Sequence, residues 1–148
     1  MTQQLDDWNT RNIKEFRESG GKIAQFGDAP VLLLTHTGAK SGTRRTNPLV
    51  YLPEAELGTA GDTMYVFASK GGASTNPDWY HNLLANPVAT VEVGTGTFEV
   101  EASEVTGEER DRVYTRQSEL RPQFAQYQAN TSRKIPVMAL RRRTVSSR

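Results

Sequence analysis

Residues 38–45 have the composition of an anion-binding loop. Two glycines frame the loop, which carries one hydroxyl group and three cationic side chains, namely Ser41, Lys40, Arg44 and Arg45. Backbone N–H groups of a tight turn, combined with cations, favour a phosphate or a carboxylate. The order of residues differs from a Walker A loop, in which Gly-Lys-Ser/Thr is followed by a helix. The alternative is a basic hairpin turn that serves only solubility.

A second glycine-rich segment follows at residues 68–73 and leads into Asn76-Pro77. We expect a strand end, a loop and the capped start of a helix. A helix N-terminus offers positive potential and unpaired N–H groups. Ser69 adds a hydroxyl group and Lys70 adds a charge. The alternative is a flexible loop before a well-capped helix.

Aromatic side chains at helical spacing could line a binding site. Trp79 and Asn82 lie three residues apart, and an aromatic ring beside an amide suits a planar heterocycle with ring carbonyl and N–H groups. Phe124 and Tyr127, with Arg133 shortly after, could form another wall. In both cases the alternative is a helix that only packs against the core.

The side chains that usually perform catalysis are scarce. The chain has no Cys, which excludes thiol nucleophiles, disulfides and zinc–thiolate sites. Its two histidines are too few for a His-rich metal centre, and we expect no metal. No catalytic triad is evident. An enzyme built from this chain would take its reactivity from a cofactor.

Short strands and helices must position these motifs. Apolar spacing and turn residues predict four helices, over residues 5–18, after Asn76-Pro77, after a capping box at residues 106–109 and around residues 124–127. They predict six strands, over residues 31–37, 46–52, 63–68, 88–93, 97–103 and 135–140. Strands linked as hairpins, without a βαβ rhythm, argue against a Rossmann fold. The pattern predicts an α+β, mainly β, class.

The 148 residues are the length of one domain. We expect an N-terminal helix at 5–18, a split antiparallel β-barrel of about six strands at 30–141 with helices outside it, and a flexible basic tail at 142–148. A closed barrel also removes exposed strand edges.

Charge and hydropathy indicate a cytoplasmic protein. Eighteen Lys and Arg against seventeen Asp and Glu give a net charge of +1, which argues against nucleic-acid binding. No apolar run approaches the roughly 20 residues of a membrane-spanning helix. The Leu5, Trp8 and Phe16 stripe could lie on a membrane surface, but the acidic residues of that helix favour packing against the barrel instead.

Taken together, these segments resemble the deazaflavin-dependent nitroreductase family of the split-barrel flavin and deazaflavin oxidoreductases, known from actinobacteria. The resemblance rests on three stretches, LLLTHTGAKSGTRRTNPLVYL, YVFASKGGASTNPDWYHNLLANP and PQFAQYQANTSRKIPVMAL. They span most of residues 32–140. The combination is specific, whereas each stretch alone would be weak.

The resemblance implies a split barrel that binds coenzyme F420, a deazaflavin with a phosphate and a polyglutamate tail, and transfers a hydride from its reduced form to a quinone or nitroaromatic acceptor. Family positions place Lys40, Ser41 and Arg45 on the phosphate and tail, with help from Lys70, and Arg44 is a further cation of the same loop that would bind the coenzyme. They place Pro48, Leu49, Val50, Ala68, Ser69, Trp79 and Asn82 around the ring. Ser69 and Tyr127 are the candidate proton donors.

The acceptor side departs from family members that activate bulky nitroimidazoles. Tyrosines line that side in those enzymes, whereas the matching residues here are Val50 and Phe124, with Tyr127 retained. A site that loses hydroxyl groups changes its choice of substrate. We therefore expect weak or absent activity on such nitroimidazoles.

Two other readings stay open. The same barrel could bind FMN, which also carries a phosphate, or the protein could be a non-catalytic deazaflavin carrier. The sequence does not decide between a monomer and a homodimer.

Overall fold

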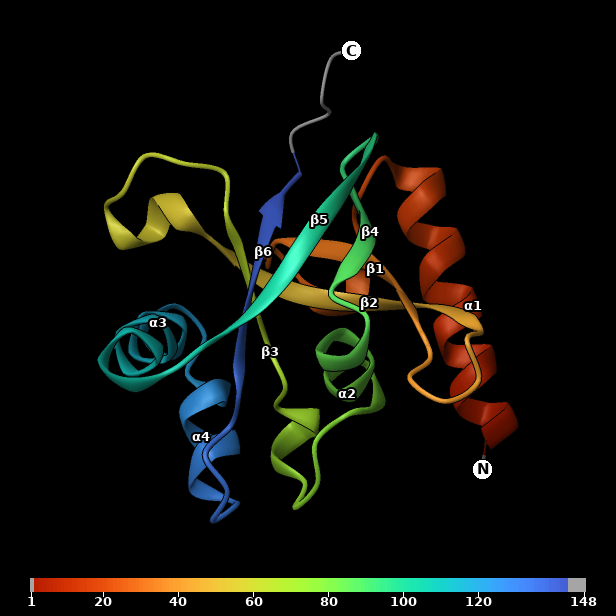
Figure 1. Ribbon diagram of the computed structural model, residues 1–148. Helices are drawn as coiled ribbons and strands as arrows, with labels where there is room; N and C mark the ends of the chain where they lie inside the picture. The colour runs from red at the N-terminus through yellow and green to blue at the C-terminus, as the bar shows by residue number, and fades with distance from the viewer. Residues whose placement is uncertain (1, 144–148) are drawn as a thin grey trace.

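In the computed structural model, six antiparallel strands close into a barrel (Figure 1). The structure describes the backbone of residues 2–143 and the side chains from residue 8 onward. The strands are β1 (Val31–Thr37), β2 (Arg44–Pro53), β3 (Met64–Phe67), β4 (Val88–Val93), β5 (Gly96–Val105) and β6 (Val137–Arg142). Around the barrel they run in the order β1-β2-β3-β6-β5-β4. The predicted antiparallel barrel of about six strands is confirmed.

Four helices surround the barrel. They are α1 (Thr2–Ser19), α2 (Asp78–Ala85), α3 (Gly107–Leu120) and α4 (Gln123–Ala129). The described residues also form three short 3-10 helices, η1 (Ala24–Phe26), η2 (Glu54–Leu57) and η3 (Lys70–Gly72). Figure 1 shows α1 on one side, α3 and α4 on the opposite side, and α2 across the lower end. Among the residues described, no helix is long and apolar enough to cross a membrane.

The barrel interior is apolar because successive side chains of a strand point to opposite faces. The interior cluster takes alternate residues from the strands, including Leu32, Leu34, Val66, Val91, Val100, Met138 and Leu140. Helix α2 adds Trp79 and Leu83 to this cluster. Trp79 is only 6% exposed, so its ring packs into the core of the barrel.

Two further apolar clusters lie between the barrel and its outer helices. Under α1, Phe16 packs with Ile23, Val31 and Leu33. Under α3 and α4, the cluster includes Tyr65, Phe67, Val105, Val113, Tyr114, Phe124, Ile135 and Val137. Phe16 is 1% exposed, which agrees with the expectation that this helix packs on the barrel. The side chain of Leu5 lies outside the described residues.

The predicted helix caps are wrong in detail. Pro77, not Asn76, is the N-cap of α2, and the Asn76 amide oxygen accepts a hydrogen bond from Arg133 instead. Thr106 is the N-cap of α3, but its side chain makes no capping hydrogen bond. Both helices begin where the pattern predicts, but the predicted capping hydrogen bonds are absent from them.

The first residue of the expected C-terminal tail, Arg142, is part of strand β6. Arg142 is the last residue of β6, and its guanidinium lies 4.2 Å from the centre of the Phe98 ring. The Arg143 N–H donates to the carbonyl oxygen of Glu99 at 3.0 Å. Arg142, expected in the basic tail, therefore belongs to β6, and the rest of the expected tail, residues 144–148, lies outside the described part.

Candidate functional site

The sequence motifs meet at the end of the barrel that α2 closes (Figure 1). The loop between β1 and β2 reaches α2, where the Ala39 N–H donates to the Asn82 side chain at 2.9 Å. The loop after β3 leads into α2 and packs against α4 through Gly72 and Tyr127. Two loops and two helices thus form one continuous region.

The β1–β2 loop is held by its own hydrogen bonds. The Gly38 N–H donates to Thr43 O at 2.8 Å, and the Gly42 N–H donates to Gly38 O at 3.1 Å. The Ser41 hydroxyl oxygen accepts from the Thr43 N–H at 3.1 Å. Gly42 has φ +71°, a conformation that favours glycine. Ser41 therefore shapes the loop, whatever it binds.

The cations of this loop are exposed and unneutralised. Lys40, Arg44 and Arg45 are all exposed to solvent. No carboxylate of the described residues forms a salt bridge with any of them. The Arg44 guanidinium donates to the Thr90 hydroxyl at 3.3 Å. The resulting positive field attracts a small multivalent anion.

A buried chain of polar side chains supports the loop from below. The Asn82 amide nitrogen lies 3.0 Å from His36 Nδ1, and His36 Nε2 lies 2.6 Å from the Asn47 amide oxygen. His36 is 1% and Asn82 8% exposed. Burial lowers the pKa of His36, and the nearby Arg45 charge adds to this, so the imidazole is neutral near pH 7.

Arg133 holds the loop that follows β3. Its guanidinium donates to the carbonyl oxygens of Ala68, Ser69 and Ala73 at 3.1, 2.9 and 2.8 Å. It also donates to the Asn76 amide oxygen at 2.6 Å. One side chain from the far end of the sequence thus satisfies four acceptors of this loop, and burial lowers the pKa of Arg133.

The same loop has an unusual backbone. Lys70 has φ +47°, and among the described residues it is the one non-glycine with a positive φ. Gly71 and Gly72 follow at +63° and +86°. Such conformations persist where the surroundings enforce them and cluster at functional sites. The Lys70 amine donates to the Thr75 hydroxyl at 3.1 Å.

The three predicted acceptor-side residues share one apolar cluster. Phe124 is buried in the cluster under α3 and α4, and Val50 and Tyr127 pack against it. The Phe124 and Tyr127 rings meet edge to face with centres 5.2 Å apart. The Tyr114 hydroxyl donates to Phe124 O at 2.6 Å and fixes the start of α4. Burial raises the pKa of Tyr114 to about 12.

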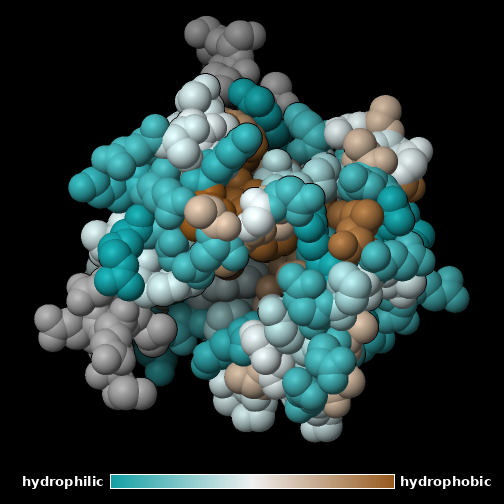
Figure 2. All heavy atoms as spheres, turned by 180° about the vertical axis from the view of Figure 1, so that it is seen from behind, coloured by the Kyte–Doolittle hydropathy of each residue, from teal (hydrophilic) through white to brown (hydrophobic). Residues whose placement is uncertain are grey.

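Val50 lies between the two outer clusters, because it also packs against the cluster under α1. In Figure 1, β1 and β2 cross behind the other strands, so the view from behind in Figure 2 looks onto their side. Figure 2 shows hydrophobic side chains gathered in a hollow at the middle of this face, framed by hydrophilic ones. This is a suitable surface for a flat apolar ring.

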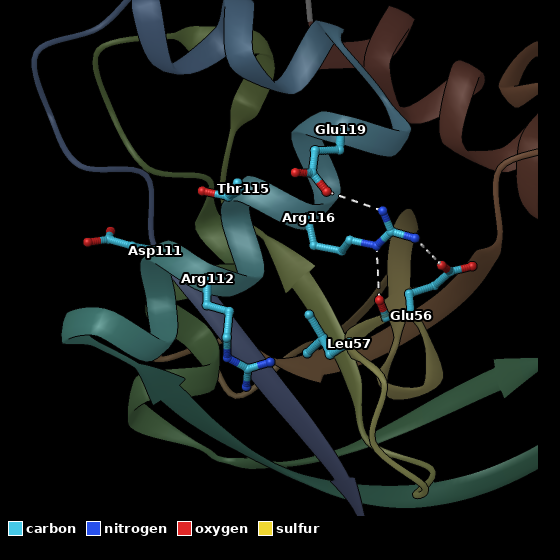
Figure 3. Close-up of a pocket in the computed structure, with 7 residues that line it drawn as sticks. All are labelled: Glu56, Leu57, Asp111, Arg112, Thr115, Arg116 and Glu119. Carbon is cyan, nitrogen blue, oxygen red and sulfur yellow. Dashed lines mark hydrogen bonds and ion pairs between the residues drawn. The ribbon is translucent and has the colours of Figure 1, made fainter.

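A second hollow lies between α3 and η2 (Figure 3) and contains none of the predicted site residues. Its central Arg116 donates to Glu56 and Glu119 at 3.0 and 3.2 Å. Arg116 is thus already paired with two carboxylates, so this hollow is a weaker candidate for an anion site than the α2 end of the barrel.

The structure places the predicted residues on the β1–β2 loop, β2, the β3–α2 loop, α2 and α4. Ala68 is fully buried, and Pro48 is buried on β2. Both ends of the Asn82 amide bond within the protein, so the geometry favours support of the β1–β2 loop over contact with a ring. Sequence reasoning missed His36 and Asn47, because their partners are distant in the chain.

The closed barrel, its cationic hairpin loop and its apolar hollow define a split-barrel oxidoreductase of the flavin and deazaflavin class. Residues 8–142 match the F420H2-dependent quinone reductase family, and the chain belongs to this family. The F420H2-dependent quinone reductase Rv1261c of Mycobacterium tuberculosis is 39% identical over 133 residues, covering 86% of this chain and 85% of that protein.

Two solved structures support the same assignment. An F420H2-dependent reductase, FDR-A, has a TM-score of 0.65 at 38% identity, covering 75% of this chain and 93% of that one. A structure described as a domain-swapped dimer has a TM-score of 0.67 at 34% identity, covering 92% and 98%. The resemblance noted in the sequence is therefore confirmed at the level of fold and family.

Proposed function

We propose how the residues of this site perform the reaction of the family, in which a hydride passes from reduced F420 to a quinone. The observation that carries the proposal is the cationic loop of Lys40, Arg44 and Arg45, which no carboxylate of the described residues neutralises. The donors fit the coenzyme, which carries a phosphate and carboxylates at one end and a flat ring at the other.

The loop binds the anionic end of the coenzyme. Arg44 and Arg45 can each offer a bidentate pair of N–H groups to a phosphate, and Lys40 adds a point charge. Ser41 keeps the turn closed through the Thr43 N–H. An anchored anion restricts the position of the rest of the molecule, which is how enzymes gain proximity.

The ring end has a matching apolar surface. The partly exposed Leu49 and Val50, with the buried Pro48 between them and the loop, form the β2 side. The loop held by Arg133 contributes the partly exposed Ser69, next to the fully buried Ala68. Lys70 lies at the exposed edge of this loop and adds a cation. Trp79 supports this end from inside the barrel. When bound, reduced F420 supplies a hydride from C5 of its deazaflavin ring.

The acceptor side consists of Val50, Phe124 and Tyr127. A quinone that gains a hydride also needs a proton at its oxygen. Ser69 and Tyr127 carry hydroxyl groups that can donate this proton, and both residues are partly exposed. The apolar walls exclude water from the reacting atoms.

The deciding experiment is a fluorescence titration of the purified protein with oxidised F420, with FMN in parallel. Micromolar or tighter F420 binding with weak FMN binding supports the proposal. Turnover of F420H2 with the naphthoquinone menadione then separates an enzyme from a carrier. A bicyclic nitroimidazole should be reduced weakly or not at all.

Tight FMN binding in place of F420, or F420 binding without turnover of several quinones, would contradict the proposal. Sedimentation of the same sample decides between the monomer and the homodimer.

A further inference from the structure

We propose that His36 is a positioning residue for the anion-binding loop, acting through Asn82, and that protonation of His36 weakens F420 binding. This inference rests on the proposed function, because it assigns the control of the loop that holds the coenzyme phosphate.

The direction of each hydrogen bond follows from a group that can only donate. The Ala39 N–H points at the Asn82 side chain at 2.9 Å, so the atom facing it must be the amide oxygen. The Asn82 NH2 group then faces His36 Nδ1 at 3.0 Å. Because NH2 only donates, Nδ1 must present a lone pair.

The tautomer of His36 is fixed as a result. A lone pair on Nδ1 places the imidazole proton on Nε2, which donates to the Asn47 amide oxygen at 2.6 Å. The chain of bonds therefore runs in one direction, from His36 to Asn47 and from Ala39 through Asn82 to His36. It requires a neutral imidazole.

A second proton on His36 cannot be accommodated without breaking this chain. An N–H on Nδ1 would face the Asn82 NH2 group, donor against donor. Turning the Asn82 amide would relieve that conflict but would aim the same NH2 group at the Ala39 N–H. A turned amide takes the acceptor away from Ala39, and an unturned amide is pushed out of place by the donor–donor conflict while its oxygen still holds the Ala39 N–H. Both outcomes disturb the support of the exposed loop, in which Lys40 is the next residue.

Several charged groups act on His36 from the elements around it. Arg45 lies opposite His36 in the β1–β2 register and disfavours a second positive charge, as does burial. Asp78 at the start of α2 and the Asn47 hydrogen bond favour it. Burial is the largest effect, so the pKa of His36 is below its ordinary value of 6.5.

The test compares F420 dissociation constants from about pH 8 to about pH 5 for four proteins. His36→Asn keeps an amide oxygen near the position of Nδ1 but cannot take a proton. His36→Leu removes the acceptor. His81→Asn changes the other histidine, which is exposed, and serves as the control. Proteins are compared at equal pH because the coenzyme has its own titratable hydroxyl.

We expect wild type and His81→Asn to lose affinity on acidification by about three- to tenfold more than His36→Asn, the value of one hydrogen bond. We expect His36→Leu to bind more weakly at every pH. The inference would be overturned if wild type and His36→Asn lost the same F420 affinity on acidification, or if His36→Leu bound F420 as tightly as wild type. Circular dichroism at each pH verifies that all four are folded.

A second measurement needs no coenzyme. In an NMR titration of the ligand-free protein, the Ala39 amide resonance should shift with the same midpoint as the His36 ring resonances. If the protein fails to bind F420 at any pH, the proposed function fails while this titration still tests His36. An Ala39 resonance that ignores the His36 titration would overturn the inference.

Discussion

Gly72 and Tyr127 meet at a contact that has no room for a side chain. A Cβ on Gly72 would lie 3.0 Å from the Tyr127 carbonyl oxygen and 3.2 Å from its Cα. The contact joins the loop after β3 to α4. The coenzyme side and the acceptor side of the proposed site therefore share one backbone support.

Gly72→Ala should lower the free energy of unfolding more than Gly71→Ala. Both residues have a positive φ, which costs a non-glycine residue about 1–2 kcal/mol. A Cβ on Gly71 meets nothing within 4 Å, whereas one on Gly72 must displace α4. Urea denaturation measures the difference, and equal losses would show that the contact is unimportant.

Arg133→Lys should destabilise the protein and weaken F420 binding. Lysine offers one point charge where Arg133 serves four acceptors. We expect a loss of about 2–3 kcal/mol in unfolding free energy, since bonds from a charged donor are the stronger ones. Arg143→Lys is the control, because that side chain makes one exposed 3.4 Å contact with Glu99. Equal melting temperatures for the two variants would contradict the prediction.

Stability should fall on acidification through His36. The pKa of His36 is lowered in the folded protein, so below about pH 6.5 the unfolded chain binds a proton that the folded protein excludes. Stability is full above that pH and declines below it until the folded-state pKa is passed. Denaturation of wild type and His36→Asn across this range should show the decline reduced in the variant. Parallel curves would refute a neutral buried His36.

Lys40→Ala and Arg45→Ala should each weaken F420 binding by about tenfold, the lower value for a hydrogen bond to a charged group. The effect should shrink at high salt because exposed charges are screened. Arg112→Ala, which removes an exposed cation from the hollow of Figure 3, is the control. Titrations at two salt concentrations measure this, and a similar loss in Arg112→Ala would indicate a non-specific effect of net charge.

Either Ser69 or Tyr127 is expected to donate the proton. Removing the hydroxyl group of the residue that donates it should lower the kcat of the enzyme by about a hundredfold. The variants are Ser69→Ala and Tyr127→Phe, assayed with menadione over a range of pH. Ser74→Ala in the same loop and Tyr80→Phe are the controls. Tyr80 donates to Glu104 at 2.8 Å, and burial with this bond raises its pKa to about 12. Unchanged kcat in both variants would assign the proton to solvent.

Much of the barrel could be predicted because its signals are local. The alternation in residues 88–103 gives the β4–β5 hairpin directly, and the glycines at 38 and 42 mark the β1–β2 turn. Strand order around the barrel could not be read in this way. The pairing of β6 with both β3 and β5 depends on packing across the whole domain.

The site was predictable where it depends on residue type and not where it depends on distant partners. The composition of the β1–β2 loop is enough to indicate an anion site, because it contains Lys40, Arg44 and Arg45. Arg133 was recognised only as a possible wall, because the acceptors it holds lie 57–65 residues earlier. No sequence pattern marks His36, because its role depends on a hydrogen bond with Asn82, which lies 46 residues later in the chain.

The position of β6 has a consequence for how the chain folds during synthesis. β6 is the last strand to leave the ribosome, yet it fills the gap between two strands made earlier. Until then β3 and β5 each present an unpaired edge, which is a template for aggregation. The barrel therefore closes only when β6 has emerged, and a chain that lacks Val137–Arg142 would keep both of these edges open.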